Sequence, residues 1–353
     1  METRNFIKDF ATLGEVIKQL LKSNSAEFKQ AINLAHNQNP YFTPFMQENA
    51  LQTICNTFLV EKELCRWLSN YPVLNINKNI AIIMAGNIPL VGFHDFLCVM
   101  ASGSTAFIKL SSKDKILLPF LANELIKINN YWEQKIIFIN SLPDNLIISP
   151  AQLTFPTAKI SSPIKIDSLI FTGSSATAKI IEEKYFAANK LIRGRRFSFA
   201  VLSGKESEKE LESLAKDVFL YYGLGCRSVN YIWVPVGYDF SLLIENFSKM
   251  QTLCKDACYM NNFKRRRALL TLQGEEFIDG GFFVLVKDVV GDMYPPIGEI
   301  RYREYDSLRE VDNFVEKNKE QIQKKYCNFG IAQAPLIDEY ADNIDTLAFI
   351  IQK

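Results

Sequence analysis

A repeated alternation of short apolar runs, turns and helical patterns constrains the fold of this chain most strongly. It begins with an apolar run at residues 80–84, followed by the turn Gly86-Asn87-Ile88-Pro89, a helical stretch closed by Gly103, and a second apolar run at 106–110. This order is typical of a βαβ unit, because parallel strands need a long crossover between them. Further strands are predicted at 135–140 and 168–171, with helices at 116–128 and 176–188. We therefore expect an α/β fold with a parallel sheet covered by helices.

The rest of the chain predicts helices before this sheet and a second α/β region after it. Up to Pro72, apolar residues recur every three to four positions, which is typical of helices. Two capping boxes, Ser207 with Glu210 and Ser307 with Glu310, predict helix starts. Gly223 is predicted to end the first of these helices. Strands are predicted at 197–202, 231–236, 282–286 and 299–305, helical stretches up to about 272, two short tail strands at 330–334 and 347–351, and a loop with one short hairpin at 145–167.

Composition excludes several classes of protein. The chain has 353 residues, which suggests two domains, and its 40 basic and 39 acidic residues provide no general field for nucleic acid. The first five residues are polar and do not resemble a secretory signal. The longest stretch free of Lys, Arg and Glu, 79–108, is interrupted by polar residues, so no membrane span is predicted. We expect a cytoplasmic protein whose seven cysteines are free thiols.

Cys226 is the candidate nucleophile. It lies in Gly223-Leu224-Gly225-Cys226-Arg227-Ser228, between a capped helix and an apolar strand, where glycines allow close approach of a ligand. Attack requires a thiolate, and the adjacent Arg227 favours that form. A buried structural thiol is the alternative, and taken alone it is the more common role of a cysteine.

Three further strand ends carry polar groups. Asn87 follows the first strand directly, where an amide can donate to an oxyanion, although Asn-x-Pro is also ordinary turn chemistry. Thr172, Gly173 and Ser174 follow a strand and open a helix, which suits either a phosphate or a simple helix cap. Lys109-Leu110-Ser111-Ser112 ends another strand and suits a ribose or phosphate as well as a solvated strand end. The three-glycine dinucleotide fingerprint is absent from the first turn.

In their order and spacing these pieces resemble the aldehyde dehydrogenase superfamily. Within it, the chain is most similar to LuxC-like fatty acyl-CoA reductases, through residues 85–91 (Ala-Gly-Asn-Ile-Pro-Leu-Val), 107–114 (Phe-Ile-Lys-Leu-Ser-Ser-Lys-Asp) and 223–226. The resemblance runs from about residue 75 to the C-terminus. It implies an α/β, aldehyde-dehydrogenase-like fold with a Rossmann-type cofactor domain and an α/β catalytic domain.

The resemblance also implies a reaction and a site. Cys226 would attack an acyl thioester, with Asn87 as oxyanion donor, and a nicotinamide cofactor, NADPH by family habit with NADH possible, would deliver hydride to give an aldehyde. Gly86, Lys109, Ser111, Thr172, Gly173 and Ser174 match cofactor-binding positions. The implied domains are residues 1–198 for the N-terminal helices and cofactor, 199–329 for the catalytic cysteine, and 330–353 for strands returning to the cofactor domain or to an oligomer interface. The active site is expected between the two larger domains.

One departure from the superfamily is informative. Hydrolytic aldehyde dehydrogenases carry a glutamate that activates water, but the matching stretch 193–200 reads Arg-Gly-Arg-Arg-Phe-Ser-Phe-Ala and has no carboxylate. Hydrolysis of a thioester should then be slow, which favours acyl exchange with a thiol such as CoA or an acyl carrier. A second segment, around 294–298, does not align with the family's nicotinamide-ribose motif. We carry no residue over from it.

Other readings of the function remain open. Reduction of an acyl phosphate, as in glutamyl phosphate reductases, also uses a cysteine without that glutamate. A non-catalytic subunit that binds cofactor or acyl groups is the alternative outside the enzymes. The superfamily implies a homo-oligomer.

Several remaining residues have plainer interpretations. Arg193, Arg195 and Arg196 could bind phosphate or form a solvated loop. Residues 264–267 predict a solvated helix face. Cys254 and Cys258 lack further ligands, so no metal site is predicted, and His94 is expected to be structural.

Overall fold

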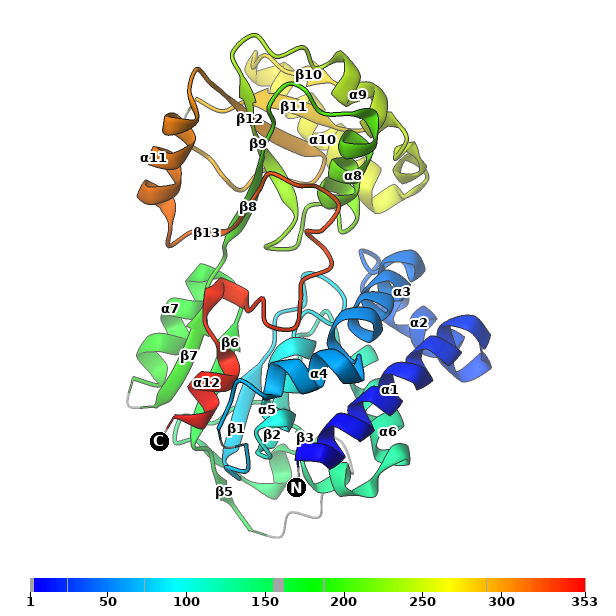
Figure 1. The fold of residues 1–353 in the computed structure, drawn as a ribbon, viewed down its shortest axis with the longest axis vertical. Helices are drawn as coiled ribbons and strands as arrows, with labels where there is room; N and C mark the ends of the chain where they lie inside the picture. Colours follow the sequence, from blue (N-terminus) through cyan, green and yellow to red (C-terminus); the bar gives the residue numbers. More distant parts are fainter. Residues whose placement is uncertain are drawn as a thin grey trace. The chain divides into compact units, whose positions relative to one another are not determined.

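The computed structural model describes residues 3–23, 25–72, 74–154, 162–186, 188–289 and 291–352. It divides the chain into two compact units (Figure 1). Residues 1–195 and 336–353 form the first unit, and residues 196–335 form the second. Among the described residues, no helix is both long and apolar enough to span a bilayer.

The first unit is built on a five-stranded parallel sheet in the order β3-β2-β1-β6-β7. Its strands are β1 (Asn79–Ile83), β2 (Thr105–Lys109), β3 (Ile136–Phe138), β6 (Ser168–Thr172) and β7 (Asn189–Arg193). The helix α5 (Phe93–Ala101) joins β1 to β2, α6 (Leu117–Ile128) and the 3-10 helix η2 (Asn130–Gln134) follow β2, and α7 (Ser175–Lys184) joins β6 to β7. The predicted βαβ unit and parallel sheet are confirmed.

Both faces of this sheet are covered, because alternate residues of each strand point to opposite sides. On one face Ile80 and Ile82 of β1 join a core that includes α5, α6 and the N-terminal helices. On the other face Ala81 packs with Tyr185, at the end of α7. A parallel sheet buried on both sides needs such uninterrupted apolar strands.

Helices at the N-terminus supply much of the first core. They are α1 (Thr3–Ser23), α2 (Ala26–Gln38), α3 (Pro44–Thr53), the π-helix η1 (Ile54–Phe58) and α4 (Glu61–Leu68). The apolar positions predicted to line them, such as Leu51, Leu64 and Leu68, are buried. Buried Asp9 of α1 accepts hydrogen bonds from the side chains of Asn129 and Trp132, so this helix is also fixed by polar contacts.

The segment between β3 and β6 contains the predicted hairpin. Strands β4 (Ile147–Ile148) and β5 (Ile164–Lys165) pair antiparallel, and the 3-10 helix η3 (Pro150–Gln152) lies between them. Residues 155–161 of the predicted loop lie outside the described residues.

The second unit contains a six-stranded sheet in the order β10-β11-β12-β9-β8-β13, in which only the β10–β11 pairing is antiparallel. Its strands are β8 (Phe197–Val201), β9 (Val229–Pro235), β10 (Ile278–Asp279), β11 (Val284–Lys287), β12 (Glu299–Tyr305) and β13 (Ile322–Tyr326). Its helices are α8 (Glu208–Phe219), α9 (Ser241–Ser248), η4 (Gln251–Lys255), α10 (Ala257–Gln273) and α11 (Leu308–Asn318). Both predicted capping boxes are present, at the starts of α8 and α11.

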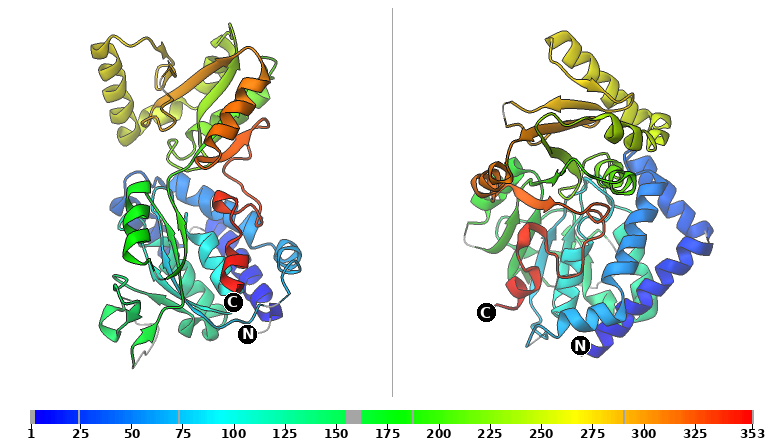
Figure 2. Two further views of the ribbon diagram at one scale, coloured as in Figure 1. Left: turned by 90° about the vertical axis from the view of Figure 1, so that its left-hand side faces the viewer. Right: turned by 45° about the horizontal axis from the view of Figure 1, so that its top comes forward.

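The predicted tail strands are wrong. Residues 330–334 form no strand, and the last segment is the helix α12 (Thr346–Ile351), after the 3-10 helix η5 (Ala341–Asn343). Asp345 caps α12 by accepting the Ala348 N–H, and Leu347 and Ile350 are buried three residues apart, a helical spacing. Figure 2 shows this C-terminal helix in red, packed within the first unit, where it contacts α5.

Smaller details also differ from the prediction. Helix α8 ends at Phe219, before Gly223, and a turn with positive φ at Tyr222 and Gly223 follows it. Strands β7 and β13 were not predicted, because charged residues occupy much of each strand and mask its apolar pattern.

Candidate active site

In the first unit, the sheet reverses its direction of winding between β1 and β6. The crossover after β1 leads through α5 to β2, whereas the crossover after β6 leads through α7 to β7 on the opposite side of β1. Open parallel sheets bind ligands at the carboxyl ends of the strands that flank such a reversal. We therefore expect a binding site at the turn of Asn87, which follows β1, and at the turn of Gly173, which follows β6.

The Asn87 turn is held tightly against the loop that follows β2. Gly86 is buried, and a Cβ atom there would lie 2.4 Å from the Ser111 Oγ, so the close approach requires glycine. The Met84 N–H donates to the Lys109 carbonyl at 3.1 Å. Asn87 itself is exposed. The turn thus presents an amide side chain from a fixed backbone.

Lys109 and Ser111 lie at the carboxyl end of β2, next to this turn. Both are half-buried. The Ser111 Oγ accepts a hydrogen bond from the Lys113 N–H at 3.3 Å, while Asp114, which is buried, accepts the Leu90 N–H at 2.9 Å. Burial raises the pKa of Asp114 to about 6. The sequence interpretation missed this aspartate, although it ends the 107–114 segment that carried the resemblance.

The turn after β6 caps the helix α7, and the Thr172 hydroxyl beside it takes no part in the cap. The Ser174 Oγ accepts the Thr177 N–H at 3.1 Å and caps α7, so the plainer of the two predicted interpretations is present. The Gly173 N–H donates to the Arg193 carbonyl. The Thr172 Oγ1 is buried without a hydrogen-bond partner among the described residues. An unpaired buried hydroxyl is costly, so this oxygen fits a site that a ligand or water completes.

Cys226 belongs to the second unit, in the loop between α8 and β9, and its side chain is half-exposed. Its carbonyl accepts a hydrogen bond from the buried Ser198 Oγ at 2.8 Å. The Gln333 Nε2 donates to the Ser228 Oγ at 3.0 Å. These contacts hold the loop at the cysteine and two residues after it.

Two buried groups of the second unit, Tyr326 and Asp217, have raised pKa values. Burial raises the pKa of Tyr326 to about 12; the Arg227 charge opposes this rise, and the Asp217 and Cys226 charges add to it. The Asp217 carboxylate accepts the Gly330 and Ala332 N–H groups at 2.6 and 3.0 Å. Burial nevertheless raises the pKa of Asp217 to about 6. Arg227, Asp217 and Cys226 thus all influence the Tyr326 hydroxyl.

The predicted phosphate-binding role of the arginine cluster is wrong for Arg193. Its side chain is 1% exposed and makes two hydrogen bonds to Asp95, at 2.8 and 3.0 Å, and one to the Thr346 hydroxyl. Arg193 ends β7 and points into the core, so it is neither a phosphate ligand nor part of a solvated loop. Arg196 donates to the Ile322 carbonyl at 3.2 Å.

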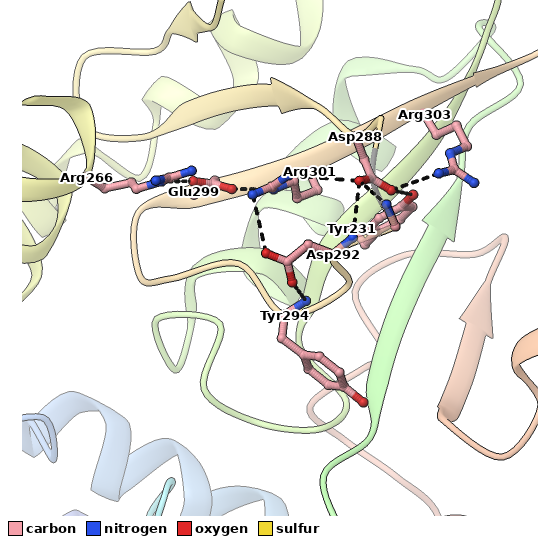
Figure 3. Close-up of polar contacts among 9 residues, drawn as sticks. Tyr231, Arg266, Asp288, Asp292, Tyr294, Glu299, Arg301 and Arg303 are labelled. Carbon is pink, nitrogen blue, oxygen red and sulfur yellow. Dashed lines mark hydrogen bonds and ion pairs between the residues drawn. The ribbon is translucent and has the colours of Figure 1, made fainter. Parts of the chain in front are cut away.

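The loop between β11 and β12, which contains the unmatched segment 294–298, is held by a buried polar network (Figure 3). Asp288 accepts hydrogen bonds from Tyr231 at 2.6 Å and from Arg303 at 3.0 Å, and its pKa is lowered although burial opposes this. Glu299, fully buried, pairs with Arg266 and Arg301. The predicted solvated face at 264–267 is therefore wrong for Arg266.

The imidazole of His94, a side chain that can bind metals, has other partners. The His94 Nε2 is 2.7 Å from the Ile337 carbonyl, and its ring packs against Phe58 and Tyr340, as expected of a structural histidine. Within the described ranges, no group of three His, Cys, Asp or Glu side chains is arranged to hold a metal ion.

Comparison with known structures identifies the fold. The chain is similar to an NAD-dependent benzaldehyde dehydrogenase from Corynebacterium glutamicum, with 12% identity and a TM-score of 0.61 over 95% of this chain and 83% of that one. It is similar to aldehyde dehydrogenase 21 from Physcomitrella patens, with 13% identity and a TM-score of 0.60 over 96% of this chain and 81% of that one. The protein therefore has the aldehyde dehydrogenase fold, as predicted.

The sequence narrows this class. The model of the acyl-CoA reductase (LuxC) family matches residues 27–250, more than half of the chain, and the chain belongs to that family. Comparison with curated protein sequences gave no match. The predicted resemblance to LuxC-like reductases is confirmed.

Proposed function

We propose that this protein reduces a fatty acyl-CoA, or an acyl group on a carrier protein, to an aldehyde with NADPH, through a thioester on Cys226. Membership of the LuxC acyl-CoA reductase family carries the proposal. The Cys226 thiolate attacks the acyl carbonyl, the tetrahedral intermediate expels the CoA thiolate, and a proton converts that thiolate to free CoA. The acyl group remains on Cys226 as a thioester.

The settings of the cysteines favour Cys226 for this step. Burial raises the pKa of the thiols of Cys55, Cys98 and Cys258, which disfavours the reactive thiolate. Cys226 is half-exposed, is not part of a disulfide among the described residues, and is fixed through its carbonyl by Ser198. A nucleophile on a fixed backbone loses little entropy when it attacks.

Asn87 is proposed to donate a hydrogen bond to the oxyanion that forms on the acyl carbonyl. Its exposed amide stands on a turn that Gly86 and Asp114 fix against the next loop. A donor that is already in position stabilises the developing charge without reorganising. This role requires that Asn87 and Cys226 act on the same acyl group.

The residues at the sheet reversal suit a dinucleotide phosphate and ribose. The Thr172 hydroxyl, unpaired among the described residues, and the first-turn N–H groups of α7 that Ser174 does not cap lie where parallel sheets bind such ligands. Lys109 and Ser111 would hold the adenosine side, and Gly86, Gly173 and Ser174 the neighbouring turns. When bound, the nicotinamide cofactor supplies the hydride that reduces the acyl thioester to the aldehyde.

The absence of a base from the matching stretch supports transfer to a thiol over hydrolysis. Arg193 stands at the start of that stretch, and its guanidinium is occupied by Asp95. Without a carboxylate there to activate water, the acyl thioester persists until hydride arrives.

The test is an acyl-CoA chain-length series with NADPH, comparing wild type with Cys226→Ala. Wild type should oxidise NADPH and release one free thiol per aldehyde, and the variant should do neither. Release of phosphate from an acyl phosphate, without thiol release from any acyl-CoA, would instead identify an acyl-phosphate reductase. Absence of both signals, with cofactor or acyl-CoA still bound, would indicate a non-catalytic subunit.

A further inference from the structure

We infer that Asp114 is a positioning residue: it holds the turn that carries Asn87 and joins that turn to the loop of Lys109 and Ser111. The effect of Asp114 on the reaction rests on the proposed function, because Asp114 acts through Asn87. Its effect on the structure of the turn does not depend on the proposed function.

Asp114 is a buried carboxylate with one hydrogen bond to the turn. It is 9% exposed, and its Oδ2 accepts the Leu90 N–H at 2.9 Å. Its Oδ1 is buried without a partner among the described residues. Burying a carboxylate with so few donors is unfavourable, and an apolar side chain would avoid that cost. The hydrogen bond from the Leu90 N–H offsets part of the cost of burying this carboxylate.

Leu90 needs such a partner, because its backbone is in the left-handed region. Its φ is +57°, a conformation that costs a residue other than glycine on the order of 1 kcal/mol or more. Its N–H is held by Asp114, and its carbonyl accepts the Phe93 N–H at the start of α5. Leu90 follows Asn87 by three residues. The hydrogen bond from Leu90 to Asp114 therefore fixes the path of the backbone that presents the Asn87 amide.

Asp114 also belongs to the loop that follows β2, and that loop is fixed from the other side. The Asp114 N–H donates to the Ser111 carbonyl at 3.2 Å. From the end of α2, the Gln38 Nε2 donates to the Ser112 carbonyl at 3.2 Å, and the Asn39 Nδ2 to the Lys113 carbonyl at 3.3 Å. Hydrogen bonds thus connect the proposed cofactor loop of Lys109 and Ser111 to the proposed oxyanion turn of Asn87.

The first experiment is hydrogen exchange of the backbone amides in full-length wild type, Asp114→Ala and Asp114→Asn. The alanine variant removes the acceptor, and the asparagine variant keeps a side-chain oxygen for the Leu90 N–H. Exchange across residues 86–92 should become at least 10-fold faster in Asp114→Ala and stay near wild type in Asp114→Asn. Unchanged exchange in a folded Asp114→Ala protein would overturn the inference, whatever the enzyme does.

The second experiment measures the single-turnover rate of Cys226 acylation by an acyl-CoA in wild type, Asp114→Ala, Asn87→Ala and the double variant. Misplacement of one donor predicts a loss of about 10- to 100-fold in Asp114→Ala, recovered in Asp114→Asn. In the Asn87→Ala background the same change should have little further effect, because Asp114 acts through Asn87. Independent, multiplying losses would overturn the positioning role.

Asp167→Ala is the control for removing a carboxylate that accepts a backbone N–H, here from an exposed position. Its carboxylate also accepts a backbone N–H, from Asn79 at 2.7 Å, but at the amino end of β1. It should leave the acylation rate unchanged; a loss equal to that of Asp114→Ala would overturn the inference, since loosening either end of the strand would then suffice. If wild type is not acylated at all, the proposed function fails, and the exchange experiment alone decides whether Asp114 holds the turn.

Discussion

The guanidinium of Arg193 makes two hydrogen bonds to the carboxylate of Asp95, at 2.8 and 3.0 Å, with both side chains almost fully buried. Arg193 ends β7, Asp95 lies in the first turn of α5, and Thr346 of α12 bonds the same guanidinium. Three segments distant in the sequence therefore depend on one ion pair. Because Asp95 is in the helix that follows the Asn87 turn, this pair also fixes that helix.

Breaking the pair should destabilise the first unit strongly. In Arg193→Met the Asp95 carboxylate stays buried without its cation, which typically costs about 3–5 kcal/mol. Urea unfolding followed by tryptophan fluorescence measures the loss. The control is Arg4→Met on α1, where the side chain is exposed and the expected change is within about 0.5 kcal/mol. Equal urea midpoints for wild type and Arg193→Met would contradict the role given to the pair.

Removing the Asn87 amide should slow chemistry without weakening the fold. Loss of one oxyanion donor costs about 100- to 1,000-fold in rate, whereas an exposed side chain contributes little to stability. Single-turnover acylation of Cys226 and a thermal melt separate the two effects. The exposed Asn37→Ala is the control and should behave as wild type. A normal acylation rate in Asn87→Ala would remove Asn87 from the mechanism.

Sequence patterns predicted β1, β2, β3 and β6 of the first sheet well, because these strands are largely buried and their apolar runs are nearly uninterrupted. Ile80, Ile82 and Ile108 illustrate this, since all are buried. Sequence patterns did not predict the structure where contacts between distant segments decide it. The charge of Arg193 masked β7, since nothing local indicates that Asp95, 98 positions away, would neutralise it. The tail was mistaken for strands because residues 347–351 are apolar at every position and show no period.

The candidate site was predicted only in part, like the fold. The turns of Asn87 and Gly173 were found because glycine and proline mark strand ends in the sequence. Asp114 and Asp217 were not, because only the folded backbone shows that each carboxylate accepts N–H groups from another loop. Asp114 and Asp217 are distinguished from other aspartates by their burial, and a single sequence does not show burial.

Asp217 predicts a measurable pH dependence of stability. Burial raises its pKa to about 6 in the folded protein, from about 3.8. A raised carboxyl pKa adds stability that is fully present below about 3.8 and is lost as pH rises through about 6. The free energy of unfolding of wild type, relative to Asp217→Asn, should therefore fall by about 2–3 kcal/mol between pH 3.5 and pH 7. Because Asp114 is present in both proteins, its own titration cancels in this difference.

The Gly330 and Ala332 N–H groups donate to different oxygens of Asp217, and asparagine replaces one of these oxygens by an NH2 group, so the variant also carries a cost that does not vary with pH. Only the slope is therefore diagnostic. A difference between the two proteins that stays constant across the pH range would show that Asp217 titrates at its ordinary pKa.

The most direct test of the central claim is the mass of the Cys226 peptide after incubation with a long-chain acyl-CoA in the absence of NADPH. We predict a mass increase equal to one acyl group on Cys226, with release of one CoA, and loss of that mass as aldehyde when NADPH is added. In Cys226→Ala, which retains the other six cysteines, no acyl adduct should form. An unmodified Cys226 peptide in wild-type protein that binds acyl-CoA, or an adduct that persists on another cysteine in Cys226→Ala and still yields aldehyde, would contradict the account.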